Sequence, residues 1–364
     1  MSRAAAGDDE VATHAEAAGC ARPPLLVLEP LRAWLDARGL GGGALRATPI
    51  GEGHSNVTYL IERDGMELVL RRPPRPPLPP SAHDMVREAR LLRALAPTAA
   101  RVPAVLAVCA EPDVIGAPFY VMERVHGAVL TTTLPAALDV PAQRRRVGEE
   151  LIDALVELHA VDWRAAGLEW LGHPTGYLER QVRRFLGLWD VNRTRELPEV
   201  ARVGEWLAQH LPASGPATIV HGDYRLGNAI FDARAPARLR ALLDWELATI
   251  GDPLADVGYL VATWSEADDA DAGPLELSPV TRGAGFPCRA ELVARYEERS
   301  GRAVRELRWY TALALWKAAV FMEGNYKRAL AGAVDDPFVR DFGDGVVELA
   351  RRAEALSLGS ARRP

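Results

Sequence analysis

The first third of the chain alternates between apolar and polar residues in short runs, which is the pattern of half-buried β-strands. A tight turn at Asp64-Gly65 joins two of these runs into a hairpin. The expected strands cover residues 45–50, 57–62, 67–71, 105–109 and 119–122. Apolar residues recur every three to four positions over 28–35 and 86–95, which predicts two helices, the second with Ser81 as its N-cap. The pattern therefore predicts a small antiparallel sheet accompanied by helices.

From about Pro141 onward the apolar period lengthens to that of helices. The expected helices cover residues 141–159, 176–189, 199–210, 289–300 and 306–330, with short strands at 229–231 and 239–243. Residues 1–26 are small and polar without an apolar period, and we expect them to be disordered. We predict an α+β chain with an N-terminal unit over 27–124 and a mostly helical C-terminal unit over 125–364.

Composition narrows the class of protein. The chain has 364 residues, of which 48% are hydrophobic and 25% charged, as in globular proteins. A net charge of −6 provides no basic field, so we expect neither a nucleic acid nor a membrane as partner. No run approaches the roughly 20 apolar residues of a membrane-spanning helix, and acidic residues occupy 8–10, where a secretion signal would be apolar.

The three cysteines are Cys20, Cys109 and Cys288. They are odd in number and far apart, so they suggest neither a disulfide framework nor a metal cluster. This usage fits a reducing compartment, and we expect the protein to be cytoplasmic. The sequence does not indicate an oligomeric state.

One segment concentrates residues suited to phosphoryl transfer. Residues 219–232 read I-V-H-G-D-Y-R-L-G-N-A-I-F-D, and A-L-L-D-W-E follows at 241–246. The reaction requires a carboxylate that orients the attacking hydroxyl, and hard oxygen ligands for Mg²⁺ on the nucleotide phosphates. An Asp, an Asn five residues later and an Asp at the end of the next strand match the kinase arrangement. We predict Asp223 as the catalytic base and Asn228 and Asp244 as magnesium ligands.

The motifs H-G-D-Y-R-L-G-N and L-D-W-E-L-A-T-I-G-D-P-L-A-D-V-G-Y-L closely resemble those of the aminoglycoside phosphotransferase family. The resemblance runs from about Leu31 to Leu330 and is greatest to the branch found as the kinase-like part of acyl-CoA dehydrogenase fusions. It implies a protein-kinase-like fold of two lobes, a sheet with a helix and then a mostly helical lobe. It also implies Mg²⁺ as cofactor, ATP or GTP as phosphoryl donor and the hydroxyl of a small molecule as acceptor.

Residues around the central motif receive supporting roles. Asp256 matches the kinase Asp that holds the backbone of the catalytic loop, and His221 is expected to maintain the loop's shape rather than to react. Arg225, inside the loop, is a candidate catalytic residue that neutralises charge or contacts substrate. Whether Glu246 approaches the metal stays open.

The expected first lobe offers candidates for binding the nucleotide. The turn G-E-G-H-S-N brings Gly51, Gly53, Ser55 and Asn56 between two strands, where glycines allow backbone amides to approach phosphates. The segment 123–127 is the expected hinge, where the backbone of Glu123 and Val125 reads the adenine edge.

A basic residue is expected on the third strand, where kinases place the lysine that holds the α- and β-phosphates. Here the matching residue is Arg71, or Arg72 if the register slips by one. An arginine keeps the charge and grips phosphate bidentately. Glu88, on the following helix, is its expected ion-pair partner. The alternative is a degenerate, inactive pocket.

Three functions remain open from the sequence. The first is a kinase acting on a small hydroxylated metabolite, with a hydroxyacyl-CoA as one candidate acceptor; Arg180, Arg183 and Arg184 are candidates to meet its phosphates. The second is an aminoglycoside 3′-type O-phosphotransferase, which needs an acidic cleft for a polycationic drug. The candidate acidic residues are Glu266, Asp268, Asp269 and Asp271. The third is a non-catalytic nucleotide-binding protein, favoured only by the missing lysine.

Overall fold

A computed structural model describes residues 9–51, 56–76, 83–270, 276–332 and 342–359. The chain divides into two compact units. The first holds the residues up to Thr98 together with Val102–His126, and the second holds Ala99–Arg101 together with the chain from Gly127 onward. Each unit is described by itself below.

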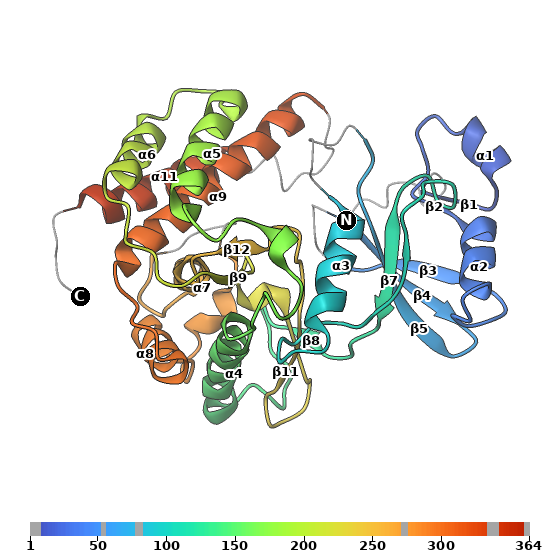
Figure 1. The fold of residues 1–364 in the computed structure, drawn as a ribbon, viewed down its shortest axis with the longest axis horizontal. Helices are drawn as coiled ribbons and strands as arrows, with labels where there is room; N and C mark the ends of the chain where they lie inside the picture. The colour runs from blue at the N-terminus through green and yellow to red at the C-terminus, as the bar shows by residue number, and fades with distance from the viewer. Residues whose placement is uncertain (1–8, 52–55, 77–82, 271–275, 333–341, 360–364) are drawn as a thin grey trace. The chain divides into compact units, whose positions relative to one another are not determined.

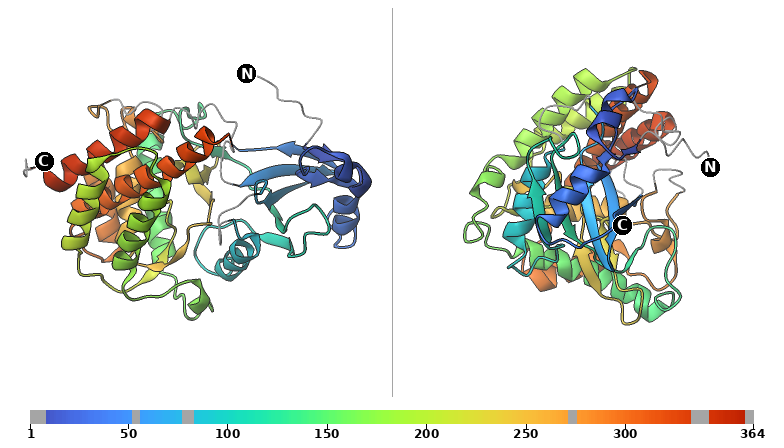
Figure 2. Two further views of the ribbon diagram at one scale, coloured as in Figure 1. Left: turned by 90° about the horizontal axis from the view of Figure 1, so that it is seen from above. Right: turned by 90° about the vertical axis from the view of Figure 1, so that its right-hand side faces the viewer.

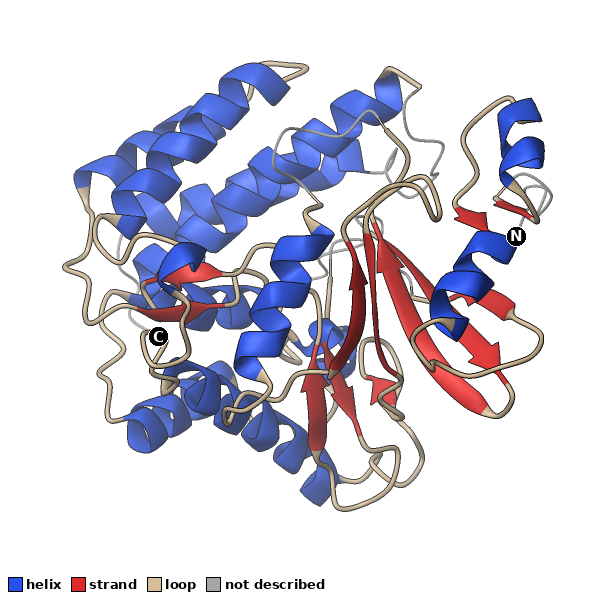
Figure 3. Ribbon diagram, turned by 45° about the vertical axis from the view of Figure 1, so that its right-hand side comes forward, coloured by secondary structure: helices blue, strands red, loops and turns tan. Residues whose placement is uncertain are grey.

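The first unit is built on a five-stranded antiparallel sheet with the order β3-β4-β5-β7-β6 (Figure 1). Its strands are β3 (Arg46–Pro49), β4 (Val57–Arg63), β5 (Met66–Arg72), β6 (Val105–Cys109) and β7 (Phe119–Glu123). Figure 3 shows these strands side by side with the helices around them. The alternating sequence pattern therefore predicted the strands of this sheet correctly.

Two helices accompany this sheet. Leu31 and Leu35 of α2 (Leu28–Asp36) join a buried cluster with Leu68 and Leu70 of β5. The other helix, α3 (Met85–Leu95), packs against β6 and β7. Its N-cap is Asp84, whose carboxylate accepts the backbone N–H of Arg87; the expected cap, Ser81, lies outside the described residues.

The expectation of a disordered segment over residues 1–26 is wrong for residues 9–26. There β1 (Glu10–Val11) pairs in parallel with β2 (Leu26–Val27), and α1 (His14–Gly19) begins after the capping side chain of Thr13. The carboxylate of Asp9 forms ion pairs with Arg22 and Arg75, and Leu26 is fully buried. These contacts involve residues distant in sequence, so a local apolar period does not reveal them.

The second unit is mostly helical, as expected (Figure 2). Its helices are α4 (Pro141–His159), α5 (Tyr177–Asn192), α6 (Pro198–Gln209), α7 (Leu254–Thr263), α8 (Arg289–Ser300), α9 (Leu307–Leu330) and α11 (Phe342–Leu358). The helix α9 lies at the centre, where it packs against α5, α6, α7 and α11. Gly258 of α7 permits a close approach, because a Cβ there would lie 2.5 Å from the Cβ of Tyr310 on α9. The sequence pattern did not predict α11.

Two small sheets hold the functional segment of the second unit. In one, β11 (Leu239–Leu242), β10 (Ala229–Phe231) and β8 (Ala128–Val129) are adjacent. In the other, β9 (Thr218–Val220) pairs with β12 (Thr249–Gly251). The loop between β9 and β10 therefore joins two different sheets. Among the described residues, the structure contains no helix with the length and apolarity to cross a membrane.

Candidate active site

The loop after β9 is held at its base by Asp256, from the first turn of α7. This carboxylate is fully buried. It accepts the backbone N–H of His221 at 2.7 Å and that of Gly222 at 2.8 Å, and His159 Nε2 lies 3.2 Å from it. Charge-assisted hydrogen bonds of this kind are stronger than neutral ones. The geometry is the one the sequence predicted for Asp256.

Both ring nitrogens of His221 bond to the backbone. Its Nε2 lies 2.9 Å from the carbonyl oxygen of Leu243, and its Nδ1 accepts the N–H of Asp223 at 3.3 Å. Nε2 therefore carries the proton and Nδ1 is the acceptor, which is the pattern of a neutral imidazole. Trp245 packs against the ring with centroids 4.6 Å apart. With both nitrogens bonded, His221 holds the loop's shape.

Gly222 turns the chain between His221 and Asp223. Its φ is +88°, in the region that favours glycine. A Cβ at this position would also lie 2.9 Å from the carbonyl oxygen of Leu247. Both the backbone conformation and the available space therefore require glycine here.

Asn228 fixes the orientation of Asp223. Its amide Nδ2 donates to the backbone carbonyl of Asp223 at 2.9 Å and to the carboxylate Oδ2 at 2.7 Å. Because both amide hydrogens point toward Asp223, the carbonyl oxygen Oδ1 of Asn228 is the atom that can ligate a cation. The 3-10 turn at Leu226–Asn228 places this side chain five residues after Asp223 in sequence yet in contact with it.

The other oxygen of Asp223 is left without a hydrogen bond. Its Oδ1 is buried and accepts none from the described part of the chain. The nearest positive group is Arg225, whose Nε lies 3.5 Å away. Buried carboxylate oxygens are normally satisfied, so such an exception calls for an explanation. A hydroxyl of a bound substrate is a donor that would satisfy it.

Leu243, the residue before Asp244, holds this part of the chain against the catalytic loop. Leu243 donates its N–H to the carbonyl of Asn228 at 2.8 Å and accepts from His221 Nε2. Asp244 itself has a φ of +64°, which is uncommon outside glycine, although Asp and Asn tolerate it better than most residues. Strained backbone of this kind clusters at functional sites. The structure thus brings together Asp223, Asn228 and Asp244.

Tyr259 is a neighbour of this site that the sequence did not reveal. It lies one turn after Asp256 on α7. Burial and then the negative charge of Asp223 hold the pKa of Tyr259 well above its ordinary value, and a hydrogen bond to the Asp223 carboxylate and the charge of Asp244 add to the effect. The i, i+3 spacing from Asp256 was the available signal, because residues so spaced share one helix face.

In the first unit, the expected ion pair between Arg71 and Glu88 is present. Arg71 Nε lies 3.3 Å from Glu88 Oε1, and the hydroxyl of Tyr120 donates to the same oxygen at 3.1 Å. Arg72 is buried and donates instead to backbone carbonyls, including those of Leu25, Pro73 and Ile115. Successive side chains of a strand point to opposite faces. The register therefore places Arg71 toward α3 and Arg72 toward the other face.

The predicted phosphate-covering turn is described only at its ends. Gly51 is exposed and has a φ of +88°. Asn56 is buried, with its Oδ1 2.8 Å from His83 Nδ1. Gly53 and Ser55 lie outside the described residues.

The predicted hinge lies at the end of the first unit. Glu123 is tied to the sheet, because its N–H donates to the carbonyl of Ala104 and its carboxylate accepts the N–H of Ala104, both at 2.9 Å. Val125 is partly buried. The first unit ends at His126, within the expected hinge segment.

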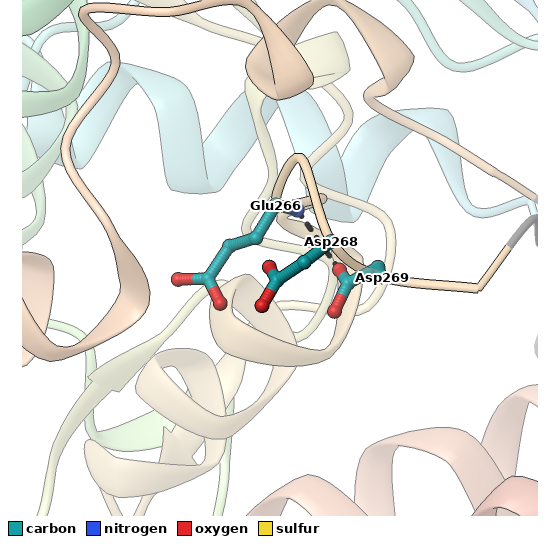
Figure 4. A group of neighbouring side chains, drawn as sticks. All are labelled: Glu266, Asp268 and Asp269. Atoms are coloured by element: carbon teal, nitrogen blue, oxygen red, sulfur yellow. Dashed lines mark hydrogen bonds between the residues drawn. The ribbon is translucent and has the colours of Figure 1, made fainter.

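The acidic turn after α7 is paired within the chain. Glu266, Asp268 and Asp269 extend from one turn (Figure 4), where the N–H of Glu266 donates to Asp269 at 2.9 Å. Arg289 forms ion pairs with Glu266 and Asp269. Burial opposes ionisation of Asp269, but the hydrogen bond from Arg289 prevails and lowers its pKa. Two of the carboxylates expected for a cationic drug therefore have an internal partner; Asp271 lies outside the described residues.

The arginines of α5 differ in their surroundings. Arg180 donates to the backbone carbonyls of His173 and Thr175 at the start of the helix. Arg183 and Arg184 are exposed. Arg180 therefore has a structural role at the start of α5.

Comparisons with known proteins identify the family. A family model for the phosphotransferase enzyme family matches residues 46–314. The mouse protein acyl-CoA dehydrogenase family member 10 is 33% identical over 313 residues, which make up 85% of this chain and 29% of the mouse protein. The chain thus spans less than a third of that relative.

Solved structures share the fold. A Ralstonia eutropha protein, provisionally assigned as an aminoglycoside phosphotransferase, superposes with a TM-score of 0.77 at 31% identity, covering 92% of this chain and 99% of that one. A mutant of aminoglycoside phosphotransferase APH(4)-Ia, in a ternary complex with AMP-PNP and hygromycin B, has a TM-score of 0.58 at 17% identity and covers 91% and 99%. The second likeness concerns the kinase-like fold alone. The chain belongs to the phosphotransferase enzyme family.

Proposed function

We propose that the protein transfers the γ-phosphoryl group of ATP or GTP to a hydroxyl of a small molecule, with Asp223 as the base. The observation that carries this proposal is the buried Oδ1 of Asp223, which accepts no hydrogen bond from the described residues while Oδ2 is fixed by Asn228. A carboxylate held at one oxygen, whose other oxygen accepts no hydrogen bond, is arranged to receive the proton of a hydroxyl.

Asp223 would orient the acceptor before transfer. The acceptor hydroxyl donates its hydrogen bond to Oδ1, which directs the hydroxyl oxygen toward the γ-phosphorus. As the new O–P bond forms, the proton passes to Asp223 and the nucleoside diphosphate leaves. Arg225, 3.5 Å from Oδ1, offsets the negative charge at this position.

The donor set beside Asp223 fits Mg²⁺. Asn228 offers an amide oxygen and Asp244 a carboxylate, and both are hard oxygen ligands of the kind magnesium accepts. Leu243 holds the backbone of the two residues together through its hydrogen bond to Asn228. Bound there, the ion would neutralise charge on the nucleotide phosphates.

The first unit would supply the remaining nucleotide contacts. We assign Arg71, positioned by Glu88, to the phosphates. Gly51, Gly53, Ser55 and Asn56 would cover the phosphates, and the backbone of Glu123 and Val125 would read the base. Support for a nucleotide comes from the relative solved with AMP-PNP. The choice between ATP and GTP is left to experiment.

The acceptor is proposed from the relatives. The mouse relative is named for acyl-CoA dehydrogenation, so a hydroxyacyl-CoA is our first candidate. An aminoglycoside acceptor has less support, because Arg289 already pairs with two carboxylates of the acidic turn. A non-catalytic role has least support, since Asp223, Asn228 and Asp244 are all present and held together.

The test is a screen of the purified protein with MgATP and MgGTP. Hydroxyacyl-CoAs, sugars, hydroxycarboxylates and amino alcohols are offered separately, and phosphorylated products are detected by mass spectrometry. We expect a product with at least one class and its loss in an Asp223→Asn variant. Equal product from that variant would refute the role of Asp223.

A further inference from the structure

A small pocket opens beside the catalytic loop, within the second unit. Gly222, the residue before Asp223, contributes to its lining, and so does Tyr259 of α7. Tyr310 and Lys317 contribute from α9, where a spacing of seven residues places them on one helix face. The pocket thus borders the catalytic loop at the residue directly before Asp223.

Lys317 brings a positive charge into this pocket. Its ammonium lies 4.9 Å from the centre of the Phe185 ring, within the range of a cation–π contact. Among the described residues it has no carboxylate partner within ion-pair distance. The charges of Asp256 and Asp223 raise the pKa of Lys317. Both carboxylates already have other partners, because Asp256 accepts two backbone N–H groups and Asp223 accepts the side-chain amide of Asn228.

The charge of Lys317 is therefore incompletely compensated by the protein. Burial, followed by repulsion from Arg184 on α5, lowers the pKa of Lys317 to about 8. Lys317 is partly buried. A cation in such a place without a partner is costly, and an anion beside it would remove much of that cost. Arg184 is exposed and adds a second positive charge near the same place.

We propose that Lys317 binds an anionic group of the acceptor, a carboxylate or a phosphate, and so selects anionic over neutral and cationic acceptors. This inference rests on the function proposed above. An acceptor whose anionic end reaches Lys317 would present its hydroxyl to Asp223 across the pocket bordered by Gly222 and Tyr259. A polycationic acceptor would meet an unfavourable charge at the same position.

The composition of the chain makes Lys317 unusual. Only two of its 43 basic residues are lysines, Lys317 and Lys327. Lys327 lies on the same helix, is exposed, and donates to the carbonyl of Val191 at 2.6 Å. It provides a matched control, because its removal takes the same charge from α9 outside the pocket.

Kinetics give the first test. Hydroxycarboxylates, each paired with its own neutral amide, and hydroxyalkyl phosphates are offered with a saturating nucleotide. We expect kcat/KM to favour each anion over its amide, and Lys317→Met to lower kcat/KM for anions by roughly 10- to 100-fold through KM, as loss of a charged hydrogen bond predicts. Lys317→Arg should retain most of the preference, and Lys327→Met all of it. Equal losses for anions and amides in Lys317→Met would overturn the proposal.

Binding gives a second test that does not depend on turnover. Reductive ¹³C-methylation preserves the charge of lysine and labels only Lys317, Lys327 and the amino terminus. The signal of Lys317 is identified by its absence in Lys317→Arg. A hydroxycarboxylate or hydroxyalkyl phosphate should shift this signal and raise its titration midpoint, whereas the amide should not. An unchanged Lys317 signal across all anions would contradict the proposal.

The two readouts separate this inference from the proposed function. If no acceptor of any charge is phosphorylated, the proposed function fails, while the ¹³C titration still decides whether Lys317 binds anions. If amides and anions are phosphorylated equally, the proposed function stands and the role of Lys317 is wrong.

Discussion

The side-chain amide of Asn228 donates to Asp223 twice, at 2.9 Å to the backbone carbonyl and at 2.7 Å to Oδ2 of the carboxylate. This arrangement leaves Oδ1 of each residue facing other partners. For Asp223 that partner is the proposed acceptor hydroxyl, and for Asn228 it is the proposed magnesium ion. One contact therefore prepares both the base and the metal ligand.

Asp244→Asn should weaken magnesium-dependent nucleotide binding without unfolding the protein. Asparagine tolerates the positive φ of +64° at this position but lacks the negative charge of a metal ligand. We expect the affinity for MgATP to fall at least ~10-fold by calorimetry, with little change in the absence of magnesium. Asp232→Asn, after the neighbouring strand β10, is the control. Unchanged affinity for MgATP in Asp244→Asn would remove this residue from the proposed site.

Asp256→Asn should destabilise the second unit. The carboxylate of Asp256 accepts the N–H groups of His221 and Gly222 and lies beside His159. The side-chain amide of asparagine has only one acceptor oxygen, so it cannot replace all of these interactions. Loss of buried charge-assisted hydrogen bonds predicts a decrease of about 2–4 kcal/mol in the free energy of unfolding, measured by urea denaturation. Asp268→Asn, at an exposed position, should change it by less than ~0.5 kcal/mol. Equal stability of the two variants would contradict the role of Asp256.

Arg71 and Arg72 should respond differently to substitution. Arg71→Met is expected to lower nucleotide affinity, and Arg71→Lys to restore part of it, because lysine keeps the charge beside Glu88. Arg72→Lys should instead lower the melting temperature, since its guanidinium donates to several buried carbonyls. Nucleotide titration and thermal unfolding of each variant make the comparison. The assignment fails if Arg72→Lys, rather than Arg71→Met, loses nucleotide affinity.

The pKa of Lys317 predicts opposite effects of pH on stability and on acceptor binding. Because the pKa falls from an ordinary value near 10.4 to about 8 on folding, the unfolded chain binds more protons between these limits. The stability contribution of Lys317 should therefore rise with pH from about 8 to 10, while KM for an anionic acceptor also rises as the ammonium is lost. The groups around it are Tyr177, Arg184, Asp223, Asp256, Tyr259 and Tyr310.

The measurement compares urea unfolding of the unmodified enzyme and Lys317→Met from pH 7 to 10. The free-energy difference should be constant below about pH 7.5 and then move in favour of the unmodified enzyme. A difference that is independent of pH would show that Lys317 titrates normally.

Local spacing in the sequence predicted that three polar residues lie close together. Asp223, Asn228 and Asp244 lie within one short segment, so their order could be interpreted without the tertiary fold. Strand alternation also implies that Arg71 and Arg72 point to opposite faces of β5, because residues on one strand face differ by two positions.

Contacts between distant segments were not predictable in this way. Phe321 is an apolar residue of α9, yet it is 50% exposed. Glu323, two positions later, is buried and bonds to Thr194 and Arg195. Lys317 and Gly222 line one pocket although they are distant in sequence, and α9 packs against α7 in the same unit. A helical period predicts which residues form the apolar face of a helix, but it does not predict which element packs against each face.

The most direct test of the account is single-turnover phosphoryl transfer by Asp223→Asn, measured beside its affinity for MgATP. The substitution keeps the shape of the side chain and removes the base. The account predicts a rate at least ~100-fold below that of the unmodified enzyme, with affinity for MgATP within about threefold. A near-normal rate of transfer to any accepted acceptor would contradict the assignment of Asp223 as the catalytic base.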